Sequence, residues 1–193
     1  MDYESGTGNK KRGKGFSLIE TLVAVSIIVF GILGALTLAS TSLKTVSVTK
    51  NYLIAENLAQ EGVELIRAKK SSNVQECLDN DPSPPCPLDR DWLKDMRSGG
   101  VNTVCFSARG CSIDIIELNP RICPANPDQC VLNYNGVYNN LSGGGGPSTI
   151  FRRLIRLQEV QTGIEVNVNV EVFWTERFGT QRVIVEENMF NWQ

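Results

Sequence analysis

The stretch GKGFSLIETLVAVSIIVFGILGAL, from Gly13 to Leu36, places one carboxylate, Glu20, at the start of an otherwise apolar run. Between Glu20 and Lys44 lie 23 uncharged residues, and about 18 such residues are enough to span a bilayer as a helix. An ionised side chain inside a membrane helix costs about 2.5–3.5 kcal/mol on insertion scales. The sequence therefore predicts a transmembrane helix over residues 16–43 that keeps an expensive acidic group near its beginning.

Basic residues precede the apolar run and predict its orientation. They are Lys10, Lys11, Arg12 and Lys14, and no basic cluster follows closely behind the run. The positive-inside rule then leaves the N-terminus in the cytoplasm. No small-residue cleavage site of the A-x-A kind ends the run, so ordinary signal cleavage is not expected. We expect a single-pass protein of the cytoplasmic (inner) membrane with an external C-terminal head.

The totals of the chain exclude several classes of function. Its 193 residues allow about one domain with an appended element, and the net charge of −2 argues against a general nucleic-acid footprint. The chain has no histidine, so a Ser–His or Cys–His nucleophile cannot form within it. No glycine-rich phosphate loop follows a strand, since Gly143–Gly146 is followed by proline. The sequence predicts neither an enzyme nor a cofactor.

Six cysteines lie beyond the apolar run, which is typical of disulfides on an oxidising side of a membrane. Fifteen connectivities are possible, and reduced buried thiols are the alternative. Adjacency predicts the pairs Cys77–Cys86, Cys105–Cys111 and Cys123–Cys130. No metal site is predicted, because the chain lacks a CxxC pair and Asp79-Asn80-Asp81 lacks the ligand spacing of a calcium loop.

Residues 44–72 continue as an amphipathic helix, which is expected to pack an apolar stripe against the head. Ile54, Leu58, Leu65 and Ile66 fall near one face, and the pattern predicts a helix end near residues 69–72. Four prolines between residues 82 and 87 predict an irregular loop over residues 73–87. Beyond it we expect a short helix over residues 89–97, two strands over residues 102–107 and 112–118, and a long excursion over residues 119–146.

The last third of the chain predicts an antiparallel meander over residues 151–190. Apolar residues alternate strictly from Ile164 to Trp174, and weaker alternation covers residues 151–160 and 181–186. A helix packed on such a sheet gives an α+β fold. The predicted domains are a leader over residues 1–15, the apolar helix over 16–43, the amphipathic helix over 44–72 and a globular head over 73–193.

The junction Lys14-Gly15-Phe16-Ser17-Leu18-Ile19-Glu20 resembles the leader junction of type IV prepilins and type II secretion pseudopilins. The resemblance implies cleavage by a prepilin peptidase between Gly15 and Phe16, followed by N-methylation of Phe16. It also implies a pilin-like architecture with disulfide-bearing loops, and partnership with other pilins or pseudopilins, an inner-membrane assembly platform and membrane lipid.

Cleavage at this junction would place a new amine four residues before Glu20, about one helical turn away. Glu20 could then neutralise the amine of its own chain or of a neighbour in a filament, which offsets the cost of a buried charge. A glutamate that snorkels to the interface of an ordinary signal anchor is the alternative. Gly31 and Gly34 either weaken the helix locally or permit close helix contact in the bilayer.

Three functions are compatible with these features. The stretch AENLAQEG, from Ala55 to Gly62, is similar to the stalk of PilV-type pilus modification proteins, which favours a minor pilin-like subunit that enters or primes a filament. A type II secretion pseudopilin is the second interpretation. The third is an adhesive or DNA-binding module displayed on a filament, with Arg152 and Arg156 as its weak basic cluster. Because period-two geometry turns Arg153 to the other face, ion pairing with acidic neighbours is favoured for these arginines.

Overall fold

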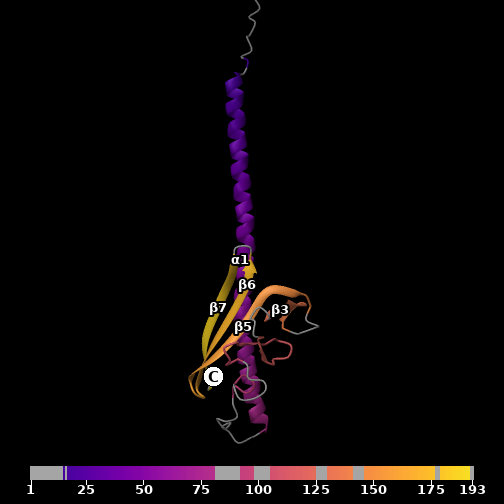
Figure 1. Cartoon of the computed structure of the whole chain (residues 1–193), viewed down its shortest axis with the longest axis vertical. Helices are drawn as coiled ribbons and strands as arrows, with labels where there is room; N and C mark the ends of the chain where they lie inside the picture. The colour runs from indigo at the N-terminus through magenta and orange to yellow at the C-terminus, as the bar shows by residue number, and fades with distance from the viewer. Residues whose placement is uncertain are drawn as a thin grey trace, which may run out of the picture. The chain divides into compact units, whose positions relative to one another are not determined.

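The computed structural model describes residue 15 and residues 17–80, 92–97, 105–124, 130–140, 146–176 and 179–191 (Figure 1). The chain divides into two compact units, Met1–Val48 and Thr49–Gln193. The first contributes an apolar helical segment, and the second contains the sheet and the core. The predicted domain boundaries at residues 15, 43 and 72 remain expectations.

The helix α1 runs from Leu18 to Asn80 and contributes residues to both units. It begins where the backbone N–H of Thr21 donates to the carbonyl of Ser17 at 3.1 Å. The predicted end near residues 69–72 is wrong, as is the irregular structure predicted for residues 73–80. The side-chain amide of Asn73, buried in the head, donates to the carbonyls of Trp92 and Lys94 at 3.1 and 2.8 Å. These distant partners hold the extra turns in place. The prolines that motivated the prediction lie beyond residue 80, outside the described residues.

Among the described residues, the meander forms the largest part of a seven-stranded sheet. Its strands are β5 (Ser148–Gln161), β6 (Glu165–Glu176) and β7 (Gly179–Phe190). Each is antiparallel to the next, with a register that shifts between Glu159 and Gln161 and continues unbroken between β6 and β7. The sequence predicted this meander, although β5 and β7 extend further than the alternation indicated. Figure 1 shows the three strands beside the second half of α1.

The middle of the chain departs from the predicted pattern. Only β1, Cys111–Ser112, is a strand within residues 105–118, where two longer strands were expected, and residues 105–109 form turns. The excursion contributes three short strands that sequence periodicity did not indicate: β2 (Arg121–Ile122), β3 (Val131–Tyr134) and β4 (Tyr138–Asn139). Both β1 and β3 pair with β5. A long central strand can stabilise two-residue partners that carry little periodic signal of their own.

The residues described between positions 92 and 97 form turns, where a short helix was predicted. The backbone N–H groups of Met96 and Arg97 both donate to the carbonyl of Leu93. Trp92, Leu93 and Met96 are nevertheless buried, as the pattern indicated. The segment therefore contributes apolar side chains to the core through a single helical turn that does not continue as a regular helix.

The core lies between α1 and the sheet. Ala55, Leu58, Ala59, Val63 and Ile66 on the helix are buried in one cluster with alternate residues of β6, which are Val166, Val168, Val170, Val172 and Trp174. The exposed Glu56, Gln60, Glu64 and Arg67 lie on the other faces of the helix. One apolar helix face on one apolar sheet face confirms the predicted α+β, pilin-like fold.

Candidate functional site

Gly15 and Glu20, the described residues of the predicted processing junction, are exposed. A Cβ atom added to Gly15 would meet nothing within 4 Å. Glu20 lies in the first turn of α1, where the N-terminal end of the helix dipole stabilises a carboxylate. Phe16 and the leader residues Lys10, Lys11, Arg12 and Lys14 lie outside the described residues.

Ser17 lies immediately before the first helical residue, Leu18. This places Ser17 at the N-cap position and Glu20 three residues later, the spacing of a capping box. The Ser-x-x-Glu spacing is therefore typical of a helix start and is independent of any membrane or filament.

The first unit exposes an unusual amount of apolar surface. Leu18 is 78% exposed and Phe30 is 75% exposed, and residues 17–49 carry no buried position. By length and composition the helix can cross a membrane. Exposed large aliphatic side chains over this length are unfavourable in water, so this segment needs lipid or other protein around it.

Hydroxyl groups in the same segment bond within the helix. Each donates to a backbone carbonyl three or four residues earlier, with donor–acceptor distances between 2.6 and 3.2 Å; the donors are Thr21, Ser26, Thr37, Ser40, Thr41 and Thr45. Inside hydrocarbon a polar group without a partner is costly. These internal bonds therefore suit the segment to an apolar environment.

Arg153 on β5 joins the sheet to α1 in the head. Its buried guanidinium donates to the carbonyl of Leu58 at 3.2 Å and to a carboxylate oxygen of Glu61 at 3.0 Å. A third bond reaches the carbonyl of Ile113, after β1, at 2.8 Å. Burial lowers the pKa of Arg153, and the adjacent Glu61 opposes that shift. The guanidinium is thus held by α1 and by the segment that follows β1.

The other arginines of β5 do not form a phosphate track. Arg156 binds Glu171 of β6 at 3.1 Å, and Arg152 lies over the ring of Phe173. Arg153 lies on the opposite, buried face, as alternation predicted. The arrangement matches the expectation of ion pairing for Arg153 and Arg156 and gives the DNA-binding interpretation no support.

Two disulfides lie in the loops of the head: Cys105–Cys111 and Cys123–Cys130. These are the pairs that adjacency predicts. Cys77 is also disulfide-bonded, and its predicted partner, Cys86, lies outside the described residues. In the described part of the chain no cluster of three or more metal-ligating side chains occurs.

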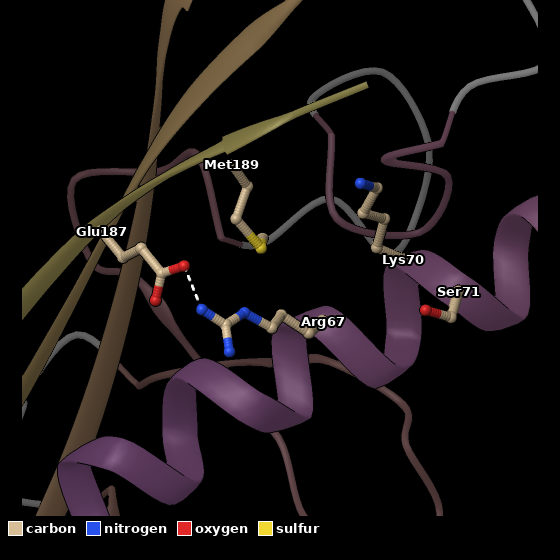
Figure 2. Close-up of a pocket in the computed structure, with 5 residues that line it drawn as sticks. All are labelled: Arg67, Lys70, Ser71, Glu187 and Met189. Atoms are coloured by element: carbon tan, nitrogen blue, oxygen red, sulfur yellow. Dashed lines mark hydrogen bonds and ion pairs between the residues drawn. The ribbon is translucent and has the colours of Figure 1, made fainter. Parts of the chain in front are cut away.

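A pocket of about 260 Å³ lies between α1 and the end of β7. In Figure 2 Arg67 points to Glu187, with which it forms an ion pair, while Lys70 and Ser71 rise from the next turn of α1. Lys70 is buried and donates to the carbonyl of Phe190 at 2.6 Å, and this burial lowers its pKa. Helix and strand lie about 120 residues apart in the chain, so sequence spacing could not have indicated this pocket. Arg67 binds Glu187 and Lys70 binds the carbonyl of Phe190, so the charged residues of the pocket hold the end of β7 to the helix.

Residues 10–36 match the family model of the prokaryotic N-terminal methylation motif. No curated protein and no solved structure matches the chain. The matched residues include the Gly15–Phe16 junction, Glu20 and the first half of the exposed apolar segment. The chain therefore carries the class III signal of type IV pilins, followed by an apolar helix and a pilin-like α+β head.

Proposed function

We propose that this protein is a minor type IV pilin-like structural subunit. Cleavage between Gly15 and Phe16 and N-methylation of Phe16 would release it to enter, or to prime, a helical surface filament. One observation carries the proposal: the methylation motif coincides with the exposed apolar segment that begins α1, and the first turn of that helix contains Glu20. The expected partners are a prepilin peptidase, other pilins and an inner-membrane assembly platform.

Glu20 has a specific role in this proposal. After cleavage the amine of Phe16 lies four residues before the carboxylate, and a filament places such groups in a low-dielectric core. Pairing the two charges, within one chain or between neighbours, offsets the cost of burying either one. Where the amine comes from a neighbouring chain, only the register that brings it to Glu20 gains this pairing, so the charge then also selects how subunits stack.

The first experiment is the intact mass and N-terminal sequence of the protein from membranes of its own host. The proposal predicts an N-methylated Phe16 start that disappears when the leader peptidase is deleted. Because a Cβ atom at position 15 would meet nothing within 4 Å, Gly15→Val is expected to leave the fold unchanged. Loss of cleavage in this variant would therefore report on the peptidase. A mature protein that starts at Met1, or beyond the apolar segment, would contradict the proposal.

The minor role needs a separate measurement. In the stretch from Ala55 to Gly62 that resembles PilV-type proteins, Ala55, Leu58, Ala59 and Gly62 are buried in the head. Quantitative mass spectrometry of sheared filaments should find this protein at a small fraction of the main subunit. An abundance equal to that subunit would contradict the minor role, and recovery only with secretion-system components would favour the pseudopilin interpretation.

A further inference from the structure

The strand β7 forms a long regular edge of the sheet. Among the described residues it pairs with β6 alone, and its register runs from Glu176↔Gly179 to Glu165↔Phe190 without a bulge. Natural edge strands are usually short or carry lysine, proline or a bulge, because unpaired backbone groups recruit other strands. The twelve residues of β7 contain neither lysine nor proline. This edge has the properties of a surface for strand pairing.

The centre of β7 has a sequence that complements itself. It reads Arg182-Val183-Ile184-Val185-Glu186. A valine lies on each side of Ile184, and the next residue outward is an arginine on one side and a glutamate on the other. The side chain of Arg182 is 67% exposed, and Ile184 is 48% exposed although it is large and apolar. Glu186 is exposed as well, so these three residues share the face of the sheet opposite α1. Val183 and Val185 are partly buried on the helix side.

We propose that β7 binds β7 of a second copy of this chain, antiparallel and centred on Ile184. Each Arg182 then lies opposite Glu186 of the other copy, and the two Ile184 side chains meet on the two-fold axis. On the helix side each Val183 lies opposite Val185. The contact is isologous, because the same residues act on both sides. It continues the sheet across the two heads.

Charge selects this arrangement over the alternatives. Oppositely charged side chains directly across an antiparallel pair stabilise it, and like charges destabilise it. Parallel pairing in register would place Arg182 beside Arg182 and Glu186 beside Glu186. Moving the two-fold axis by one residue, to Val183, would place Arg182 opposite Ile184. The register centred on Ile184 pairs both charges and all three apolar residues.

The direction of α1 determines which copies can meet in this way. Near the start of β7, Gln181 pairs with Trp174, whose ring packs on Tyr52 at 5.1 Å. Near its end, Lys70 binds the carbonyl of Phe190. Within the head, α1 and β7 therefore run in the same direction. In a two-fold pair, residue 49, at which the head begins, lies at opposite ends of the two copies. The two heads of such a pair therefore point in opposite directions, and the pairing does not depend on filament assembly.

The test uses the full-length protein inserted at one chain per lipid nanodisc. Mass photometry and sedimentation then measure pairs of discs held together by their heads. We expect wild-type discs to pair. Arg182→Glu and Glu186→Arg should each weaken pairing by on the order of tenfold or more. An equimolar mixture of the two variants should pair again, because positions 182 and 186 then carry opposite charges at both contacts between the two chains.

Further variants separate this edge from the rest of the surface. Ile184→Lys places two like charges on the axis and should abolish pairing, whereas Arg109→Glu, which changes an exposed turn elsewhere in the head, should leave it unchanged. Thermal unfolding of each variant checks that the head remains folded. The proposal is overturned if wild-type discs stay single, if either charge variant pairs as well as wild type, or if the mixture of folded variants fails to pair.

Discussion

A Cβ atom on Gly62 of α1 would lie 2.7 Å from Cγ1 of Val170 on β6. The same atom would lie 3.2 Å from Cδ of Arg153. Helix and sheet therefore approach so closely that only hydrogen fits at this position. Because Val170 is fully buried and β-branched, it has no free rotamer into which it could retreat. This contact sets the distance between α1 and the sheet.

Gly62→Ala is expected to destabilise the head, although alanine is favoured over glycine in a helix by about 1 kcal/mol. Overpacking of this kind typically costs about 1–3 kcal/mol, so the clash outweighs the gain in helix propensity. Urea unfolding followed by tryptophan fluorescence measures the change. Gln60→Ala, on the exposed face of the same turn, is the matched control and should be nearly neutral. An unchanged or higher unfolding midpoint for Gly62→Ala would mean that the helix can move away from the sheet.

Arg153→Ala is expected to lower the free energy of unfolding by about 1–3 kcal/mol, the cost of leaving buried hydrogen-bonding groups without a partner. The variant removes the donor to the carbonyls of Leu58 and Ile113 and leaves a cavity beside α1. Arg121→Ala removes an exposed i,i+4 partner of Glu117 and should change stability by less than about 1 kcal/mol. Equal effects of the two variants in denaturant titration would contradict a structural role for the buried guanidinium.

Glu176 should contribute a pH-dependent part of the stability. Hydrogen bonds from two side chains lower the pKa of Glu176. The bond from Asn51 has the larger effect, and the bond from Trp174 has the smaller one. A carboxyl whose pKa is lower in the folded state stabilises the fold above the unfolded pKa of about 4.3, and this contribution is lost as the pH falls through the folded pKa. Unfolding midpoints measured between pH 7 and pH 3 should therefore fall less in Glu176→Gln than in wild type. Glu56→Gln, at an exposed helix position, is the control, and a Glu176→Gln profile parallel to wild type would refute the linkage.

Glu20→Ala should separate processing from assembly. The substitution leaves Gly15 and Phe16 unchanged, so cleavage and methylation are expected to proceed. Incorporation into filaments should fall severalfold, since the amine of Phe16 then has no carboxylate at the proposed register. The measurement is the ratio of this protein to the main subunit in sheared filaments, normalised to its amount in membranes. Thr21→Ala alters the adjacent residue and should assemble normally, whereas normal assembly of Glu20→Ala would exclude the pairing.

The elements with a strong hydrophobic period were predictable from the sequence. The uninterrupted apolar run predicted the exposed helix, and the alternation from Val166 to Trp174 predicted β6 and the face that it buries. The extension of α1 beyond residue 72 was not predictable, because it depends on Asn73 bonding with residues that follow 19 or more positions later. The strands β2 and β4 contain two residues each and are too short to show an alternation of apolar and polar residues.

Two features of the sequence indicate the close packing of helix and sheet, although the alternation of apolar residues did not connect them. Gly62 interrupts an amphipathic helix at a cost in propensity, which indicates a close approach at that position. Arg153 occupies the same strand face as Phe151 and Ile155, so its burial follows from the period of β5. The sequence could not show that Gly62 and Arg153 contact each other, because 91 positions separate them and only the packing of α1 on the sheet brings them together.

The hydroxyl groups of the apolar segment carry their own hydrogen-bond acceptors, one turn earlier in the same helix. The hydroxyl groups of such a segment need no hydrogen-bond partner from its surroundings. When neighbouring helices replace lipid tails around it, no hydroxyl has to exchange one partner for another, and only the quality of side-chain packing changes. The free energy of transfer between the two environments then depends mainly on charge, and in the proposed function Glu20 is the group by which this segment would distinguish an assembled neighbour from the bilayer.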